Sequence, residues 1–465
     1  MQLLDYALIA TYLATLLYLG FRTRLSRTAG AAELIVGGRT LTLPAFVASL
    51  VSTWYGGILG VGEFSYQHGL STWLVFGLPY YVAAALFAIF LAKKARQSEV
   101  LTIPERLASA YGNRTAAAGA VIIFLMTVPA AYVLMLGVLC QYLFGWPYWL
   151  GVVGGTLFSI CYVYLGGFQS VIRTDLFQFA LMYVGFAVLL GLLITTYGTI
   201  DFIVPRVPTE ALSWHGGNTG WYIATWYFIA LSTLIEPAFY QRCYAAKSAT
   251  TARTGIFISI ACWAVFDFMT TACGLYARAL LPDLADPVSS YPALAELVLP
   301  SGLLGLFALS MMSIIMSTID SYSFLAASTF GRDIVERTFG LESRHATTSY
   351  TRIGLVVSVA LAVGLALYFR SVVEIWYLFG SIGTPALLAP VFFSHVGRRR
   401  FTAASAPASI VLSGGTALAW YLSQYWTTDG TYWLGLEPIF PGLAVSLLVW
   451  WFRGEHADNL PMRAV

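Results

Sequence analysis

The sequence predicts an all-α integral membrane protein with 13 transmembrane helices. Of its 465 residues, 58% are apolar and only 10% are charged, whereas about 25% of the residues in an average soluble domain are charged. A soluble chain of this length would have too few charged side chains to cover its surface. The composition therefore excludes a soluble enzyme, a nucleic-acid-binding protein and a disordered chain, and we expect membrane lipid to surround most of the protein.

Runs without charged residues mark the spanning helices in order along the chain, and each span needs about 20 apolar residues. The first run follows Asp5 and has no basic segment before it, so we expect a retained helix rather than a cleaved signal peptide. Residues 115–172 carry no charge, which requires two spans joined by a tight turn near Trp146 and Pro147. The expected spans are 5–22, 44–67, 71–92, 118–143, 146–168, 174–198, 219–240, 254–281, 302–330, 349–369, 372–395, 403–425 and 434–452.

The basic residues predict the orientation of these helices. With the N-terminus outside, 22 of the 25 Lys and Arg residues fall on the cytoplasmic side, among them Arg242 at the end of span 219–240. Only Arg206, Arg278 and Arg370 fall outside. This asymmetry follows the positive-inside rule, and one missed span would destroy it. We therefore expect an external N-terminus and a cytoplasmic C-terminus.

Two expected spans contain polar interruptions at similar depth. Span 44–67 carries a run of Ser, Thr and Gly within 48–57, and span 219–240 carries Glu236 followed by Pro237. Unwound backbone inside a membrane is tolerated where it lines a cavity, and paired breaks in two halves of a chain typically mark a transporter binding site. Close helix packing explains the glycines equally well, whereas a Glu–Pro pair is costly in a plain span.

Span 302–330 carries oxygen-bearing side chains on one face. Ser317, Asp320 and Ser321 stand at i, i+3 and i+4. Hydroxyls, carboxylates and free carbonyls suit a hard monovalent cation, although Ser hydroxyls also bond back to their own helix. Asp267 lies in the middle of span 254–281, and a functional or a structural role remains open for it.

Four stretches resemble the sodium:solute symporter family, which includes sodium-coupled transporters of proline, galactose and sialic acid. They are 37–41, 164–178, 240–247 and 316–333, and they follow the family order across about 37–400. The resemblance implies a LeuT-like core of five-plus-five inverted repeats in a bacterial inner membrane. The parts would be an extra N-terminal helix and cytoplasmic loop (1–43), the first repeat (44–198), an external loop (199–218), the second repeat (219–395), and two C-terminal helices with a short cytoplasmic tail (396–465).

The resemblance also implies ion sites between the broken first core helix and the eighth. The implied sodium ligands are the carbonyls of Val51, Trp54 and Ile314 and the hydroxyls of Ser317 and Thr318. A second cation would bind Asp175, Ser317, Asp320 and Ser321. Because Asp320 replaces a hydroxyl found in some two-sodium members, proton coupling remains an alternative.

The implied solute site departs from the sugar transporters. Ile58 stands where sugar-transporting members use Gln, so we expect a solute other than a sugar. Glu236 stands at a polar contact position among aromatic residues, which suits an amine-bearing or cationic solute. A role for Glu236 as a brace of the helix break remains equally open. The expected substrate contacts are Thr53, Trp54, Tyr55, Gly56, Trp226, Tyr227 and Glu236.

The sequence therefore predicts a sodium-coupled secondary active symporter that imports a small organic solute by alternating access. The alternatives are a proton-coupled symporter and a membrane sensor that works with a separate signalling partner. We expect no enzyme, because the sequence carries no Ser/His/Asp set, His cluster or Gly-rich phosphate loop. Sodium is the expected cofactor, and nucleic acid is not an expected partner.

Overall fold

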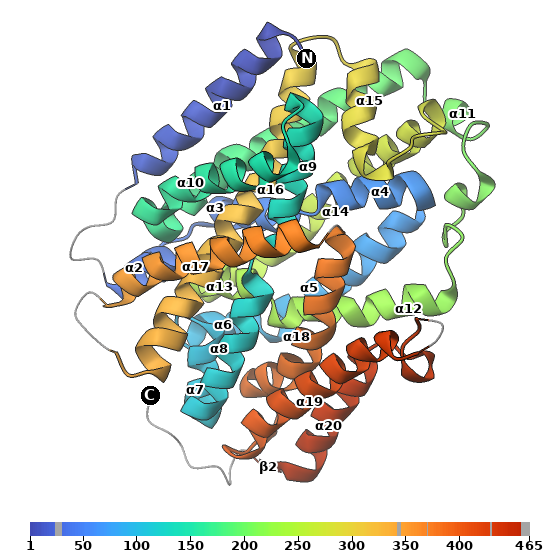
Figure 1. Cartoon of the computed structure of the whole chain (residues 1–465). Helices are drawn as coiled ribbons and strands as arrows, with labels where there is room; N and C mark the ends of the chain where they lie inside the picture. The colour runs from blue at the N-terminus through green and yellow to red at the C-terminus, as the bar shows by residue number, and fades with distance from the viewer. Residues whose placement is uncertain (24–29, 342–345, 370, 428–429, 457–465) are drawn as a thin grey trace.

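The computed structural model describes residues 1–23, 30–341, 346–369, 371–427 and 430–456, which form a bundle of α-helices (Figure 1). The first half of the chain forms α1 (Leu3–Phe21), α2 (Ala31–Val36), α3 (Leu43–Trp54), α4 (Ile58–His68), α5 (Leu78–Phe90), α6 (Ala92–Gln97), α7 (Ile103–Tyr111), α8 (Asn113–Thr127), α9 (Ala130–Phe144), α10 (Tyr148–Tyr197) and α11 (Ile200–Ile203). The second half forms α12 (Gly220–Ile229), α13 (Pro237–Ala245), α14 (Ala249–Leu280), α15 (Ser290–Val298), α16 (Leu303–Ser328), α17 (Ala346–Tyr368), α18 (Val372–His395), α19 (Ser405–Leu422) and α20 (Ile439–Arg453).

Local sequence explains where several helices begin. The hydroxyls of Thr102, Thr219 and Ser248 accept backbone N–H groups at the starts of α7, α12 and α14, and such caps stabilise a helix by about 1 kcal/mol. Two short strands, β1 (Arg399–Phe401) and β2 (Gly454–His456), pair antiparallel beside α20 (Figure 1). Arg370, which the charge pattern places outside the membrane, lies outside the described residues.

Most of the bundle consists of helices that suit a membrane. Among the described residues, eight helices are long and apolar enough to cross one, and the bent pair of α3 and α4 adds a ninth. The expected spans 403–425 and 434–452 overlap α19 and the shorter apolar helix α20. All-helical architecture is confirmed, while 13 spans and the repeat layout stay predictions.

Two expected spans fall largely within one long helix that has a break inside it. Most of 146–168 and of 174–198 lies in α10, whose 50 residues would measure about 75 Å if straight. That is more than twice the roughly 30 Å thickness of membrane hydrocarbon. Gly167 interrupts the helix with φ 57, a left-handed conformation that glycine adopts without steric cost. The break therefore lies at the end of the first expected span, close to the expected boundary between the two.

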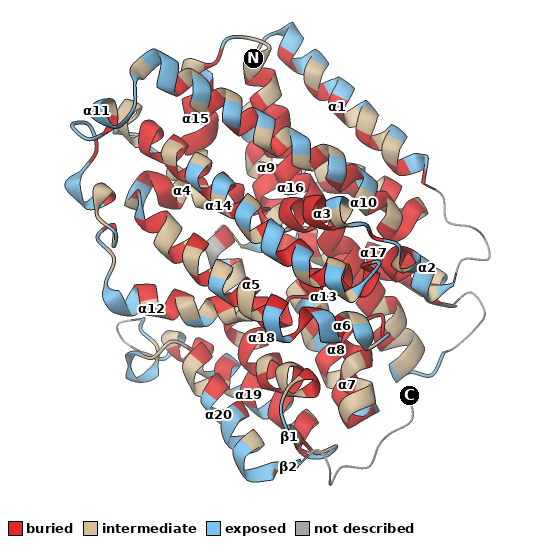
Figure 2. Cartoon of the chain, turned by 180° about the vertical axis from the view of Figure 1, so that it is seen from behind, coloured by how far each residue is buried: buried red, intermediate tan, exposed pale blue. Residues whose placement is uncertain are grey.

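The helix α16 lies at the centre of the bundle. Within the helical segment Leu303–Thr338, which α16 begins, an apolar stretch of 18 residues is 89% buried, whereas the corresponding stretch of α1 (Leu3–Phe21) is only 28% buried. Figure 2 shows the same contrast, with α16 mostly red and α1 banded in pale blue, tan and red. The polar side chains of α16 are therefore held among protein atoms rather than lipid, which is where a membrane protein can use them.

Candidate functional site

The two expected helix breaks both occur. The chain bends by 62° between α3 and α4, at Tyr55, Gly56 and Gly57. The second break lies between α12 and α13, where a 3-10 segment (Ala230–Ile235) leads into extended backbone at Glu236. Pro237 then begins α13, a position where its missing N–H removes no helical hydrogen bond.

The first break lies against two adjacent hydroxyls of α16. Ser317 Oγ donates to the carbonyl of Ser52 at 2.8 Å, and Thr318 Oγ1 donates to the carbonyl of Thr53 at 2.9 Å. Both hydroxyls are also 3.2 Å from the carbonyl oxygen of Ile314. The last carbonyls of a helix have no hydrogen-bond donor within that helix. At the end of α3 the hydroxyls of α16 fill this role, and carbonyl and hydroxyl oxygens meet in a buried place.

This contact contains three of the five expected sodium ligands. Ser317, Thr318 and Ile314 come together, and the α3 carbonyls that they meet lie between Val51 and Trp54, the other two expected ligands. Glycine is required at the break, because a Cβ on Gly56 would lie 2.2 Å from Thr318 Oγ1. The polar atoms that meet here are hydroxyl and carbonyl oxygens, which are suitable ligands for a hard cation.

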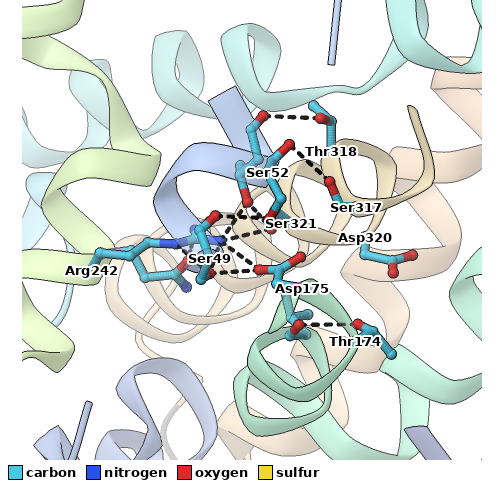
Figure 3. A network of polar contacts seen from close by, with 12 residues as sticks. Ser49, Ser52, Thr174, Asp175, Arg242, Ser317, Thr318, Asp320 and Ser321 are labelled. Atoms are coloured by element: carbon cyan, nitrogen blue, oxygen red, sulfur yellow. Dashed lines mark hydrogen bonds and ion pairs between the residues drawn. The ribbon is translucent and has the colours of Figure 1, made fainter. Parts of the chain in front are cut away.

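The expected second cation set is not brought together. Asp320 Oδ1 and Oδ2 accept the hydroxyls of Ser159 and Tyr162 on α10, while the Ser317 hydroxyl is directed to Ser52. Asp175 and Ser321 meet elsewhere, around the guanidinium of Arg242. Figure 3 shows Asp320 apart from this network.

Arg242 is the central residue of that network. It lies in the last turn of α13, as expected for the end of this span, and the side of the membrane on which α13 ends stays a prediction. The Arg242 side chain has no solvent exposure, and neither does that of Asp175, with which it forms an ion pair of 3.4 Å. The hydroxyls of Ser49, Thr53 and Ser321 complete the network, which joins α3, α10, α13 and α16 (Figure 3). A lone arginine would be costly at this depth, and the ion pair and hydroxyls compensate it.

A cavity of about 220 Å³ lies beside the two breaks. Its walls come from α3, α4, α5, α8, α9, α12, α14, α16 and α18, and about half of the lining residues are aromatic. The aromatic lining residues are Trp54, Tyr55, Phe76, Tyr80, Tyr81, Tyr132, Trp226, Trp263, Tyr322, Trp376, Tyr377 and Phe379. The charged residues among the described lining are two carboxylates, Glu236 and Asp267.

Glu236 caps the helix that follows the second break and also lines the cavity. Its Oε1 accepts the backbone N–H of Ala238 at 3.3 Å, which caps α13, and the hydroxyl of Tyr322 at 2.9 Å. The described residues provide no hydrogen bond to Oε2, although the side chain lines the cavity. Oε1 therefore braces the helix break, while a contact of Glu236 with the substrate stays a prediction.

Asp267 is the second acid of the cavity. Its two oxygens accept the hydroxyls of Tyr55, at the first break, and Tyr81, on α5. The Tyr55 hydroxyl also lies 2.9 Å from Thr270 Oγ1. The carboxylate thus connects α14 with the first break and with α5, and both oxygens are hydrogen-bonded while the residue lines the cavity.

Four of the seven expected substrate contacts line the cavity, namely Trp54, Tyr55, Trp226 and Glu236. Three do not. Thr53 bonds with Ser321 and Arg242, Gly56 lies against Thr318, and Tyr227 packs on a separate cluster around Val75.

Sequence reasoning missed the cavity tyrosines of α5, α9 and α16 and the tryptophans of α14 and α18. They are ordinary aromatic residues of apolar spans, so no local signal separates them from lipid-facing ones. Asp267, an acidic residue in the middle of span 254–281, was the residue of this part of the cavity that the sequence analysis singled out.

The chain has close counterparts among known transporters. Residues 34–411 match the sodium:solute symporter family. The chain is 25% identical to the sodium/pantothenate symporter of Escherichia coli (strain K12), with 93% of this chain and 92% of that protein covered. It is also 25% identical to the high affinity choline transporter 1 of Homo sapiens, with 80% of this chain and 69% of that protein covered.

A solved structure shares the fold. A sodium-coupled sialic acid symporter in a substrate-bound, outward-open state superposes with a TM-score of 0.79 at 19% identity, and the match covers 97% of this chain and 96% of that chain. These findings confirm the family resemblance and the LeuT-like helical fold. They also confirm that the protein is a transporter rather than an enzyme and that sodium is its cofactor. By the family match over most of its length, this chain belongs to the sodium:solute symporter family.

Proposed function

We propose that this protein imports a small amine-bearing or cationic solute, other than a sugar, together with sodium. The observation that carries the proposal is Glu236, which lines the cavity and whose Oε2 receives no hydrogen bond from the described residues. A buried carboxylate in a membrane protein is costly without a compensating charge or donor. An ammonium group of the solute supplies both.

The walls of the cavity support a cation. The described lining contains two carboxylates and neither Lys, Arg nor His. Trp54 and Trp263 lie with ring centroids 6.1 Å apart, and Phe239 packs against both. Aromatic faces attract ammonium groups, and such aromatic cages recognise choline-like cations. A relative that transports choline is consistent with this chemistry, although the relatives together span several solute classes.

We propose that sodium binds where the first break meets α16. Its ligands would be the carbonyls of Val51, Trp54 and Ile314 with the hydroxyls of Ser317 and Thr318. The hydroxyls already lie within hydrogen-bond distance of carbonyls at the end of α3 and of Ile314. Binding there joins α3 to α16, so sodium would stabilise one arrangement of the break and thereby the cavity beside it.

The proposed arrangement in the membrane follows the expected one. The chain would cross a bacterial inner membrane 13 times, with repeats at 44–198 and 219–395, the N-terminus outside and the C-terminus in the cytoplasm. The matching breaks of α3–α4 and α12–α13 support two related halves. Alternating access would then open the cavity to one side of the membrane at a time.

Uptake into proteoliposomes tests the solute class. With radiolabelled choline as probe and an inward sodium gradient, we expect uptake that unlabelled ethanolamine inhibits and galactose does not. Glu236→Gln should weaken choline binding by about tenfold or more. The quaternary ammonium of choline has no N–H to donate, so the loss is that of the attraction between two opposite charges, about 4 kcal/mol at about 4 Å for an effective dielectric constant of about 20. Tyr227→Phe, outside the cavity, is the matched control and should behave as wild type.

Two outcomes would contradict the solute proposal. The first is pantothenate or another anion as the strongest inhibitor of transport. The second is a Glu236→Gln protein that melts at a lower temperature but keeps the wild-type order of solute preference, which would leave Glu236 as a brace alone.

A further inference from the structure

The cavity beside the two breaks contains two acids that lie on different helices. Glu236 is the residue before α13, at the second break. Asp267 lies on α14 and accepts hydroxyls from the first break and from α5. Both residues line the cavity and each is 8% exposed, and the described lining contains neither Lys, Arg nor His. Two carboxylates in one enclosed cavity repel each other, and a solute with one positive charge can neutralise only one of them.

Both acids can accept further hydrogen bonds. An ionised carboxylate has about two acceptor positions on each oxygen. Glu236 Oε2 receives no hydrogen bond from the described residues. Each oxygen of Asp267 accepts one tyrosine hydroxyl, which leaves a second position on each. Each acid can therefore accept N–H groups from an ammonium group of a solute.

An aromatic wall extends from the helix of one acid to the helix of the other. Trp263 precedes Asp267 by four residues on α14, so the two side chains share a face of that helix. The Trp263 ring centroid lies 6.1 Å from that of Trp54 and 5.8 Å from that of Phe239. Phe239 stands in the first turn of α13, whose N-cap is Glu236. Because Trp54 and Trp263 also line the cavity, the surface that connects the two acids suits methylene groups.

We propose that the solute is a diamine, with one ammonium group at Glu236, the other at Asp267, and methylene groups against Trp54 and Trp263. The inference rests on the proposed function and specifies its solute class. Two acids joined by an aromatic wall match a molecule with two charged ends and an apolar middle. The cavity of about 220 Å³ is smaller than the roughly 300–1,000 Å³ of pockets for drug-sized ligands, which favours a short chain.

Thermal unfolding of the purified full chain in sodium tests this inference without transport, because a ligand of the folded state raises the melting temperature. The probes are 1,4-diaminobutane and 1-aminobutane, which have the same carbon chain and differ by one ammonium group. At constant ionic strength, the diamine should reach half of its stabilisation at a concentration about tenfold lower or less, since it gains hydrogen bonds to a second charged group. The diamines one carbon shorter and one carbon longer, each with its monoamine, cover the neighbouring lengths.

Asp267→Asn removes one negative charge and keeps a side chain of similar size. It should reduce the preference for the diamine over the monoamine to about twofold or less, while the monoamine midpoint stays close to that of wild type. The matched control is Glu296→Gln. Glu296 also accepts a tyrosine hydroxyl, from Tyr142 at 2.8 Å, but it is not among the described residues that line the cavity. This control should keep the wild-type preference.

A wild-type protein that all three diamines stabilise no better than their monoamines would overturn the inference, and so would an Asp267→Asn protein with the full preference. If Asp267→Asn does not fold, Glu236→Gln takes its place, because loss of either acid leaves a partner for only one ammonium group. Equal stabilisation by diamines and monoamines would contradict the diamine inference alone. Stabilisation by pantothenate and by none of the amines would contradict the proposed function as well.

Discussion

Gly56→Ala places a methyl group where the first break meets α16. The added Cβ would lie 2.2 Å from Thr318 Oγ1, 2.5 Å from its Cβ and 2.6 Å from its Cγ2. Because all three atoms are this close, rotation of the Thr318 side chain does not relieve the overlap. The break and α16 must therefore move apart.

The size of this movement follows from the same distances. An ordinary contact begins at 3.4 Å, so the two segments must separate by about 1.2 Å. That movement takes the bond from Thr318 to the Thr53 carbonyl from 2.9 Å to beyond the range of a protein hydrogen bond. Overpacking of this kind costs about 1–3 kcal/mol. If the sodium-bound state is destabilised by about 1.4 kcal/mol relative to the sodium-free state, the affinity for sodium falls about tenfold.

Thermal unfolding of the purified protein measures the effect. With potassium replacing sodium at constant ionic strength, the melting temperature should rise with sodium, because a ligand that binds only the folded state stabilises it. The sodium concentration for half of this rise should be about tenfold higher in Gly56→Ala.

The matched control is Gly60→Ala in α4, whose added Cβ would lie 3.4 Å from Trp376. We expect its sodium midpoint to stay close to that of wild type. An unchanged midpoint in Gly56→Ala, or an equal shift in Gly60→Ala, would show that this contact does not control sodium binding.

Two further predictions concern ion binding and the ion pairs of Glu105. The double change Ser317→Ala and Thr318→Ala should abolish the stabilisation by sodium in the same melting assay; a wild-type response would exclude both hydroxyls as ligands. Glu105 accepts from Arg332 and Arg337, so Glu105→Gln should lower the unfolding free energy by about 1–3 kcal/mol. Chemical unfolding measures this loss. The control Glu336→Gln weakens a 3.4 Å ion pair with Arg332 and should lower the unfolding free energy by only about 0.5 kcal/mol. Equal losses in the two variants would refute the expectation that the contacts of Glu105 contribute more to stability.

The sequence by itself determined the class of protein and the places where its helices break. These features depend on local composition, since a charge-free run or a Glu–Pro pair has the same energetic meaning wherever the helix lies in the bundle. The family resemblance, the helical fold and sodium as cofactor were predictable from the same residues. The pairing of the first break with Ser317 and Thr318 followed from the resemblance, and the contacts now place these segments together.

The surroundings of each charge were decided only by the tertiary structure. Arg242 follows a span and resembles an ordinary loop arginine, because composition does not reveal that α3, α10 and α16 enclose it. Asp320 and Ser321 are neighbours in sequence, but successive residues of a helix point about 100° apart. Asp320 therefore faces Ser159 on α10, and Ser321 faces Thr53 on α3. The cavity likewise depends on aromatic residues from seven helices, and only their packing brings those side chains together.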